Sequence, residues 1–420
     1  MATEDARYRQ SSQYQLWSFS PTRLAAMRDK TNAAARARIA ERLSSLPALS
    51  NNTSAPTSSA NTPNADGSST PALPEFLTPP EEAQLVTFFT SELLRAGDHA
   101  EMSDDIKATA AAFFRRFYVT NSIMTYPPQE MLFVALFFGC KAEGTFVSIA
   151  EFGKTFDREH PEDILAGEFL LCQGLRFAID VKHPFRALRG ATMELATLPD
   201  IDRNRLAAAE HRAREVLRFS PLITDAYFHY TPSQIMLAAL SLADRGLTER
   251  LMTQTFHHVA PPPDNSGADT PASSGPDGPA PATKRGPPRG SEDKAQIIGP
   301  HIRDQVLGTI EACRNLLARE LPERREHWSD RAVLKAQVTP LRKKLSKCRD
   351  PDRWNLVELQ RVRREQAAKR ADSEEADPAP PGAAAANNTA AGDGTVFGDA
   401  LAPREVKRRR VLDDPFGGPL

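Results

Sequence analysis

The chain has 420 residues, of which 40% are hydrophobic and 25% are charged, and its formal net charge is -1. Its longest uninterrupted apolar run, Met131 to Phe138, is far shorter than the ~20 residues of a membrane-spanning helix, and no apolar segment follows the charged start, so we expect neither membrane insertion nor secretion. The four cysteines are widely separated and lack CxxC or Cys/His spacing, which argues against a disulfide framework or a metal site and favours a reducing compartment.

Prolines divide the chain into two kinds of sequence. Of the 34 prolines, 22 fall within 44–80, 260–293 and 371–420, and the remaining sequence is poor in proline and rich in apolar residues. Such proline-rich, polar stretches bury too little apolar surface to offset the entropy of ordering them. We therefore expect a folded protein that carries disordered segments.

The N-terminal segment, 1–43, reads as an ordered anchor followed by a helix. Ser20 is a good N-cap and Pro21 occupies the first helical position, where a missing N–H is tolerated. No proline or glycine interrupts the sequence from there to Leu43. The stretch 44–75 that follows is expected to be a disordered linker.

Five helices are expected in 76–180. The stripe of apolar residues in 101–118 has 3.6-residue spacing, and the sequence PPQEMLFVALFFGC is apolar nearly all round, which is typical of a helix buried on every side. The sustained alternation of apolar and polar residues that predicts β-strands is almost absent. The expected helices span 78–94, 101–118, 127–144, 147–156 and 161–177.

An internal repeat at an offset of 104 residues points to a second copy of this domain in 181–321. The sequence YPPQEMLFVAL, from Tyr126, aligns without a gap with YTPSQIMLAAL, from Tyr230, and Lys141 corresponds to Arg245. The period is too long for a solenoid, so we expect an all-α tandem pair of domains. The expected helices of the second copy span 185–195, 203–219, 232–243 and 247–257, with a last one that begins near Lys294 and is helical from 302 to 321. A disordered insertion at 260–293 separates the last two.

The C-terminal region, 322–370, is expected to be helical. Apolar residues between Leu334 and Cys348 follow 4-3-4-3 spacing, which predicts one amphipathic helix that Pro351 ends. The rest, 371–420, is expected to be a disordered tail. Within it the basic run at 407–410 (Lys407, Arg408, Arg409 and Arg410) is typical of a nuclear import signal.

Catalysis and nucleic-acid binding are poorly supported by the residues. The chain lacks the motifs of serine hydrolases, P-loop and dinucleotide-binding proteins and zinc proteases, so we expect a non-enzyme without metal or cofactor. Residues 76–259 carry 18 Lys or Arg against 24 Asp or Glu, a poor composition for binding phosphates, whereas 323–370 carry 15 against 7. The basic side chains of that last region more often form the solvated face of an amphipathic helix than a nucleic-acid site.

Two charged residues lie where apolar neighbours surround them. Lys141 ends the all-apolar helix, and Glu168 interrupts the sequence ILAGEFLLCQGL. A charge at the edge of a core needs a partner, and the two side chains can pair if their helices are adjacent. The pair is either a local salt bridge or part of a surface that binds another chain.

Several segments resemble a known family at these residues. They are SSQYQLWSFSPTRLAAMRDKTN, FFRRFYVTNSIMTYPPQEMLFVALFFGCKAEG, ILAGEFLLCQGLRFAIDVKHPF and LITDAYFHYTPSQIMLAALSLADR. Together they resemble cyclin H, the cyclin subunit of the cyclin-dependent-kinase-activating kinase, in a fungal-type form with disordered insertions. The patterns SSQ-x-x-x-W-x-F and TDAY-x-x-YTPSQI are specific to this cyclin among cyclins, and the resemblance covers 11–43, 76–257 and, more faintly, 294–365.

The resemblance implies an all-α fold of two tandem five-helix cyclin boxes with flanking helices. It implies a regulatory subunit that binds and allosterically activates a cyclin-dependent kinase, with a third assembly subunit, in transcription factor IIH in the nucleus. Lys141 and Glu168 match the Lys and Glu with which cyclins face the mobile helix of the kinase. By the same resemblance Phe177 and Ile179, after the fifth helix, would present apolar surface to the kinase. Ala142-Glu143 and Cys172 depart from the common cyclin pattern at this contact.

Three other functions are compatible with a double helical domain. Another transcriptional cyclin would have no counterpart of the N-terminal W-x-F block. A double-cyclin-box general transcription factor that binds DNA would carry an N-terminal zinc ribbon and basic boxes, which this sequence lacks. A helical scaffold without a kinase partner is the third.

Overall fold

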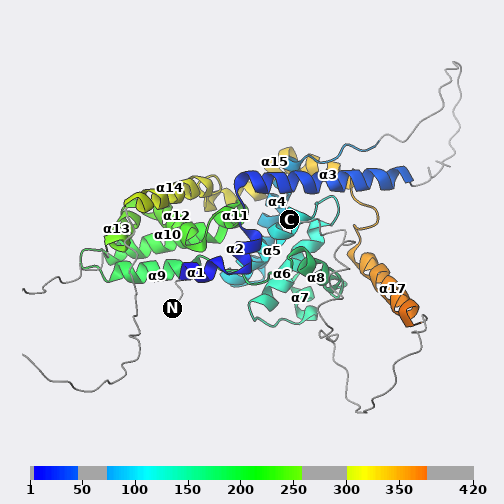
Figure 1. Ribbon diagram of the computed structural model, residues 1–420, viewed down its shortest axis with the longest axis horizontal. Coiled ribbons are helices and arrows are strands. Elements are labelled where there is room, and N and C mark those ends of the chain that lie inside the picture. The colour runs from blue at the N-terminus through cyan, green and yellow to red at the C-terminus, as the bar shows by residue number, and fades with distance from the viewer. Residues whose placement is uncertain (1–3, 46–72, 258–299, 376–420) are drawn as a thin grey trace, which may run out of the picture. The chain divides into compact units, whose positions relative to one another are not determined.

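The computed structural model describes residues 4–45, 73–257 and 300–375, and every regular element in these ranges is helical (Figure 1). The predicted all-α class is therefore confirmed. Most of the predicted linker, the predicted insertion and the basic run at 407–410 lie outside the described residues. Residues 1–365 form one compact unit, and the second unit, 366–420, is described only for 366–375. None of the described helices has the length and apolar character needed to cross a bilayer.

The N-terminal segment folds into two short helices and one long one. They are α1 (Glu4–Arg9), α2 (Ser12–Trp17) and α3 (Pro21–Ser45). Trp17 and Leu24 are buried in a small apolar cluster that also contains Phe228, far along the chain. The N-terminal segment is thereby anchored to a distant part of the same unit.

The first group of five helices surrounds a central helix, α5. The helices are α4 (Pro79–His99), α5 (Asp104–Thr120), α6 (Pro128–Ala142), α7 (Ile149–Thr155) and α8 (Asp163–Gly174). Helix α5 starts three residues later than predicted because the Ser103 side chain caps it. It is buried on all sides from Ala108 to Val119, rather than along one stripe, because α3, α4, α6, α8 and α10 all pack around it.

The second group packs around α12, the counterpart of α6 in the repeat. The helices are α9 (Phe185–Ala196), α10 (Arg203–Ile223), α12 (Pro232–Ala243), α13 (Arg245–His257) and α14 (Pro300–Leu317), with a short α11 (Ala226–His229) between α10 and α12. Helices α6 and α12 open at prolines 104 residues apart, so the repeat found in the sequence corresponds to two helices of the same kind in the structure. Two predicted ends were wrong. Helix α10 continues through Pro221 to Ile223, and α14 ends at Leu317 rather than at 321.

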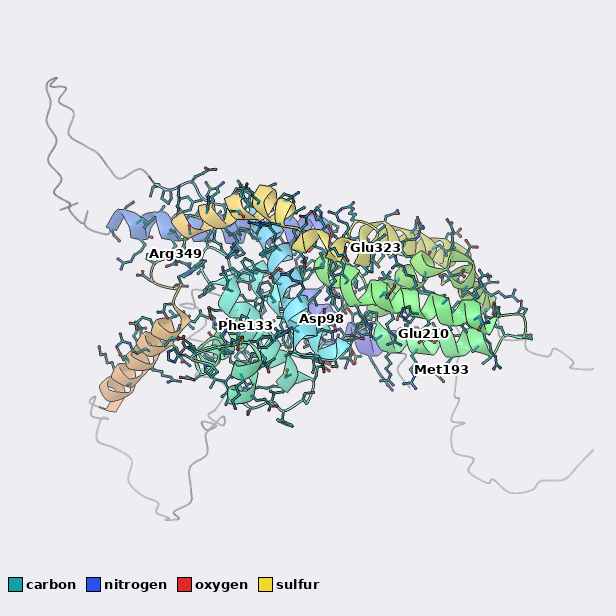
Figure 2. All side chains as sticks on the ribbon, turned by 180° about the vertical axis from the view of Figure 1, so that it is seen from behind. Asp98, Phe133, Met193, Glu210, Glu323 and Arg349 are labelled. Carbon is teal, nitrogen blue, oxygen red and sulfur yellow. The ribbon has the colours of Figure 1, made fainter. Side chains whose placement is uncertain are left out.

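The C-terminal segment returns from the second group to the first, and Glu323 and Arg349 mark two points on this path (Figure 2). The predicted continuous helix from Leu334 to Cys348 was wrong. A π-helical turn, η3 (Leu334–Val338), precedes α16 (Thr339–Lys347) because Pro340 lacks an N–H and its ring would clash with the preceding turn. The remaining elements are η1 (Pro322–Arg325), η2 (His327–Ser329), α15 (Arg331–Val333) and α17 (Leu356–Glu375).

Candidate functional site

Close packing of α6 and α8 brings Lys141 and Glu168 together. Gly167 permits this approach, since a Cβ at that position would lie 2.6 Å from Cγ2 of Val134. Lys141 Nζ lies 2.6 Å from Glu168 Oε1 and 4.4 Å from the centre of the Phe137 ring. The side chains are 41% and 21% exposed, so the ion pair lies at the surface and remains accessible to another molecule.

Helix α8 presents apolar side chains on both of its faces. Ile164, Leu170 and Leu171 are buried in the core, whereas Leu165 and Phe169, four residues apart, are 38% and 59% exposed. Exposed apolar side chains grouped in this way mark binding surfaces. Since Glu168 lies between them in sequence, the outer face of α8 combines apolar contacts with one ion pair.

The turn after α8 extends this surface. Phe177 is 65% exposed, and its ring packs edge-on against Phe169 with 6.5 Å between ring centres; Ile179 is 45% exposed. We call the set Lys141, Leu165, Glu168, Phe169, Phe177 and Ile179 the α8 surface.

The backbone of this turn is strained. Arg176 and Phe177 both adopt the left-handed conformation, with φ of 54° and 56°, which costs an L-residue about 1–2 kcal/mol. Buried Leu175 and Ala178 hold the turn on either side, and the Phe177 N–H donates to the Cys172 carbonyl at 2.9 Å. Arg116 Nη1 donates to the Ala178 carbonyl at 3.3 Å, so a buried arginine also supports the turn. The fold thus holds Phe177 outward at an energetic cost.

Sequence reasoning identified Lys141, Glu168, Phe177 and Ile179, and the structure places all four in one region, but it missed Leu165 and Phe169. The signal was present, because α8 contains more large apolar residues than one buried face can accommodate. Phe146, 93% exposed in the loop after α6, was also missed, and its sequence position gives no such signal.

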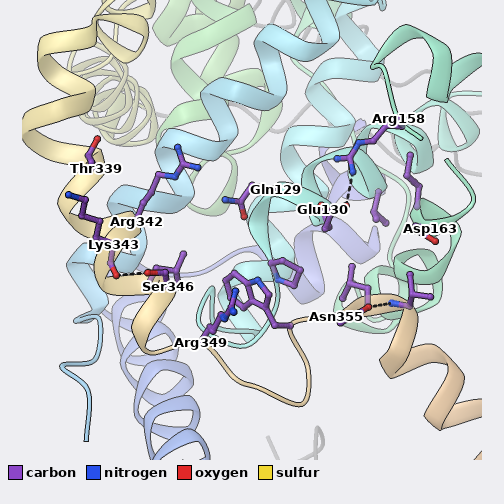
Figure 3. Close-up of a pocket in the computed structure, with 17 residues that line it drawn as sticks. Gln129, Glu130, Arg158, Asp163, Thr339, Arg342, Lys343, Ser346, Arg349 and Asn355 are labelled. Atoms are coloured by element: carbon purple, nitrogen blue, oxygen red, sulfur yellow. Dashed lines mark hydrogen bonds and ion pairs between the residues drawn. The ribbon is translucent and has the colours of Figure 1, made fainter. Parts of the chain in front are cut away.

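A separate cavity of about 850 Å³ lies between α6, α8 and the segment from α16 to α17 (Figure 3). Arg342, Lys343 and Arg349 line one side, and none has an ion-pair partner among the described residues. Across the cavity Arg158 is already paired with Glu130 at 2.9 Å. The cavity therefore has a positively charged side formed by α16 and the residues that follow it.

The buried titratable groups have the character of structural residues. Burial raises the pKa of all four cysteine thiols, that of Cys313 to about 12, so they are poor nucleophiles near neutral pH. Burial lowers the pKa of His183 to about 3, and its ring nitrogens contact Thr109 and Tyr227 at 2.7 and 2.9 Å. The described part of the chain contains no group of three His, Cys, Asp or Glu side chains placed to hold a metal ion.

Comparison with known proteins gives consistent matches. Residues 183–318 match the family model of the cyclin C-terminal domain. The chain is 30% identical to cyclin CCL1 of Saccharomyces cerevisiae over 256 residues, which cover 60% of this chain and 62% of that protein. It is also 30% identical to cyclin mcs2 of Schizosaccharomyces pombe over 235 residues, covering 56% of this chain and 68% of the relative. The match to CCL1 thus spans less than two thirds of that relative.

Two solved structures are also similar. A chain in the structure of the CAK complex from Chaetomium thermophilum bound to ATP-gamma-S is 63% identical, with a TM-score of 0.71, covering 91% of this chain and all of that chain. A chain of the yeast TFIIK (Kin28/Ccl1/Tfb3) complex is 23% identical, with a TM-score of 0.50, covering 74% of this chain and all of that one, and this likeness shows the fold alone.

Proposed function

Because the chain belongs to the cyclin H family, we propose that it is the regulatory subunit that binds and allosterically activates a cyclin-dependent kinase within a CDK-activating kinase complex. Through that kinase it would act in RNA polymerase II transcription, by phosphorylation of the polymerase C-terminal domain, and in the activation of cell-cycle kinases. The α8 surface is the observation that carries the proposal.

The α8 surface has the composition of a protein–protein contact. Its apolar side chains can be buried by a partner helix, and aromatic residues such as Phe169 and Phe177 are enriched in protein–protein interfaces relative to the rest of the surface. The Lys141–Glu168 pair supplies one charge of each sign beside them. A kinase helix that offers apolar residues and complementary charges fits both features.

Activation follows from differential affinity. A cyclin that binds the active arrangement of the kinase better than the inactive one shifts the population toward the active state by the difference in binding free energy. Holding the mobile helix inward completes the Lys–Glu ion pair of the kinase, which is needed for phosphoryl transfer. The kinase catalyses phosphoryl transfer. We propose that this chain is not itself an enzyme and that it shifts the kinase toward its active state.

The same family membership supports further partners. Solved complexes with similar chains are a CAK complex and a TFIIK complex that contains Kin28, Ccl1 and Tfb3. We extend the proposal to a third assembly subunit, to the transcription factor IIH core and to residence in the nucleus. The basic run at 407–410 and the predicted domain boundaries stay predictions from sequence.

Reconstitution with the kinase tests the proposal. Lys141→Ala and Glu168→Ala each leave the other charge unpaired in the contact, which typically costs 2–5 kcal/mol, so we expect at least about 30-fold weaker kinase binding. Calorimetry and phosphorylation of a polymerase C-terminal repeat peptide are the two measurements. The matched control is Arg245→Ala, because Arg245 is the repeat equivalent of Lys141 and pairs with Glu249 on the surface of α13. Unchanged binding and activity in both variants would contradict the proposal.

A further inference from the structure

The large cavity between α6, α8 and the segment from α16 to α17 is separate from the α8 surface (Figure 3). None of the six residues of the α8 surface lines it. Its volume of about 850 Å³ falls within the range of about 300–1,000 Å³ that is usual for ligand sites. The cavity is therefore a second place at which another molecule can bind.

Two arginines that line the cavity have no partner within the described part of the chain. Arg342 and Arg349 are exposed, and neither side chain makes a hydrogen bond or an ion pair with a described residue. Lys343 adds a third positive charge on the same side. Lys344, by contrast, pairs with Glu81 of α4 at 2.9 Å. The fold thus uses Lys344 to hold α16 in place and leaves the two guanidinium groups available to a ligand.

The backbone that carries these arginines is held firmly against the first group of helices. Leu345 and Cys348 are buried, at 3% and 0% exposed. The Asp350 N–H donates to the Met124 carbonyl at 2.8 Å, and the Asp350 carboxylate pairs with Arg38 at 3.0 Å. A site whose backbone is already ordered costs less conformational entropy when it binds a ligand.

The rest of the lining combines an aromatic ring with neutral polar groups. Trp354 is half-buried, and Gln129 and Asn355 carry side-chain amides, which can hydrogen-bond a peptide backbone. Glu130 and Asp163 lie on the side away from α16 (Figure 3). The positive charge is therefore confined to one wall of the cavity.

We propose that this cavity binds an extended protein segment with phosphorylated Ser-Pro or Thr-Pro steps, whose phosphate groups contact Arg342 and Arg349 and whose proline packs on Trp354. The forked donors of arginine match the oxygens of a phosphate group, which carries a charge of about -1.5 to -2 near pH 7. Aromatic side chains are the usual lining of grooves that bind proline-containing segments.

The spacing of the two arginines favours an extended segment over a single anion. Their backbone positions are seven residues apart along α16 and its end, which corresponds to about 10 Å. An extended peptide covers that distance in about three residues. Two phosphates three residues apart therefore match the two guanidinium groups.

A nucleic acid is the alternative polyanion, and it fits the cavity less well. Its phosphates follow one another along the whole strand, so some of them would lie beside Glu130 and Asp163, where like charges repel. A phosphopeptide carries its negative charge only at the modified residues. It can direct these toward α16 and present neutral backbone to the rest of the cavity.

Binding of a synthetic peptide to the full chain, without a kinase, tests the proposal. The peptide carries two phosphoserines three residues apart, each followed by proline, and a fluorescent label for anisotropy. We expect it to bind at least about 10-fold more tightly than the unphosphorylated peptide, a peptide with Glu in place of each phosphoserine, or one with Ala in place of each proline. Equal binding of the Glu peptide, or of a single-stranded RNA of the same length, would overturn the proposal.

Paired variants separate the cavity from general electrostatic attraction. The double variant Arg342→Ala/Arg349→Ala should bind the phosphopeptide at least about 10-fold more weakly. The control Lys335→Ala/Lys347→Ala removes the same charge from two exposed residues that do not line the cavity, and it should keep the affinity. An equal loss in both double variants would refute the assignment of the two arginines.

The outcome is independent of the proposed activation of a kinase. The peptide is measured on the free chain, and neither arginine belongs to the α8 surface. Loss of phosphopeptide binding with normal kinase activation would remove this second site alone. Failure of Lys141→Ala and Glu168→Ala to affect the kinase would leave the phosphopeptide site standing.

Discussion

Two substitutions of Phe177 distinguish the cost of the strained backbone turn in stability from the contribution of the Phe177 ring to kinase binding. Phe177→Ala and Phe177→Gly both remove the ring, but only glycine adopts a φ of 56° without steric cost. The side chain is 65% exposed, so roughly 70 Å² of a Phe surface of about 200 Å² is buried within the chain. At about 25 cal/mol per Å², either variant loses roughly 2 kcal/mol of packing.

The two variants should differ in stability but not in binding. Glycine recovers about 1 kcal/mol or more of backbone strain, so we expect the free energy of unfolding of Phe177→Gly to exceed that of Phe177→Ala by that amount. Both should bind the kinase at least about 30-fold more weakly, as expected when a central aromatic residue is removed from an interface. Denaturant unfolding of the free chain and calorimetry with the kinase measure the two quantities.

Glu101 provides the matched control. It is exposed between α4 and α5 and has a φ of 51°, so Glu101→Gly should also be more stable than Glu101→Ala, with no change in kinase binding. Equal stability of the Gly and Ala variants at position 177 would refute the strain. Wild-type affinity in both would show that Phe177 is not part of the interface.

Two further predictions concern the first group of helices. Burial raises the pKa of Glu82, which accepts a hydrogen bond from Ser122, from 4.5 to about 7. Protonated Glu82 therefore makes its full contribution to the free energy of unfolding below pH 4.5. This contribution, at most about 3 kcal/mol, is lost as the pH rises through 7. Denaturant unfolding at pH 5 and pH 8 should show this loss in the wild type relative to Glu82→Gln, and parallel pH profiles would refute the shift. Gly167→Ala should destabilise the chain by about 1–3 kcal/mol and weaken kinase binding, because the added Cβ would overlap Val134. The control Gly190→Ala, on an open face of α9, should be neutral or stabilising. Equal thermal midpoints for the two variants would refute the close packing of α6 and α8.

The helical repeat was predictable because its signals are local. The prolines that open α6 and α12 and the apolar sequences after them specify buried helices wherever they occur. The interruption before α16 was also local, since Pro340 stands within the predicted helix, but the apolar spacing around it concealed the break. The spacing of apolar residues is the same whether or not one residue of the helix lacks a backbone N–H, as Pro340 does.

The α8 surface was only partly predictable, since exposure depends on what packs nearby. Lys141 and Glu168 were recognisable as charged residues among apolar ones. Leu165 and Phe169 are residue types that usually lie in a core, and they are exposed because α6 packs against the opposite face of α8. The left-handed turn at Arg176 and Phe177 contains no glycine, the residue that usually indicates such a conformation in a sequence. Its conformation depends on contacts with Trp17 and Arg116, which are distant in sequence.

The anchoring of the N-terminal segment also sets an order of events during synthesis. Arg28 pairs with Asp225, 197 residues later, and the Phe19 N–H donates to the Phe228 carbonyl at 2.8 Å. At translation rates of 5–20 residues per second, the first helices leave the ribosome roughly 10–40 s before their docking partners exist. During that interval the apolar cluster that buries Trp17 and Leu24 lacks Phe228, so the N-terminal segment completes its packing only after the second group of helices has been synthesised.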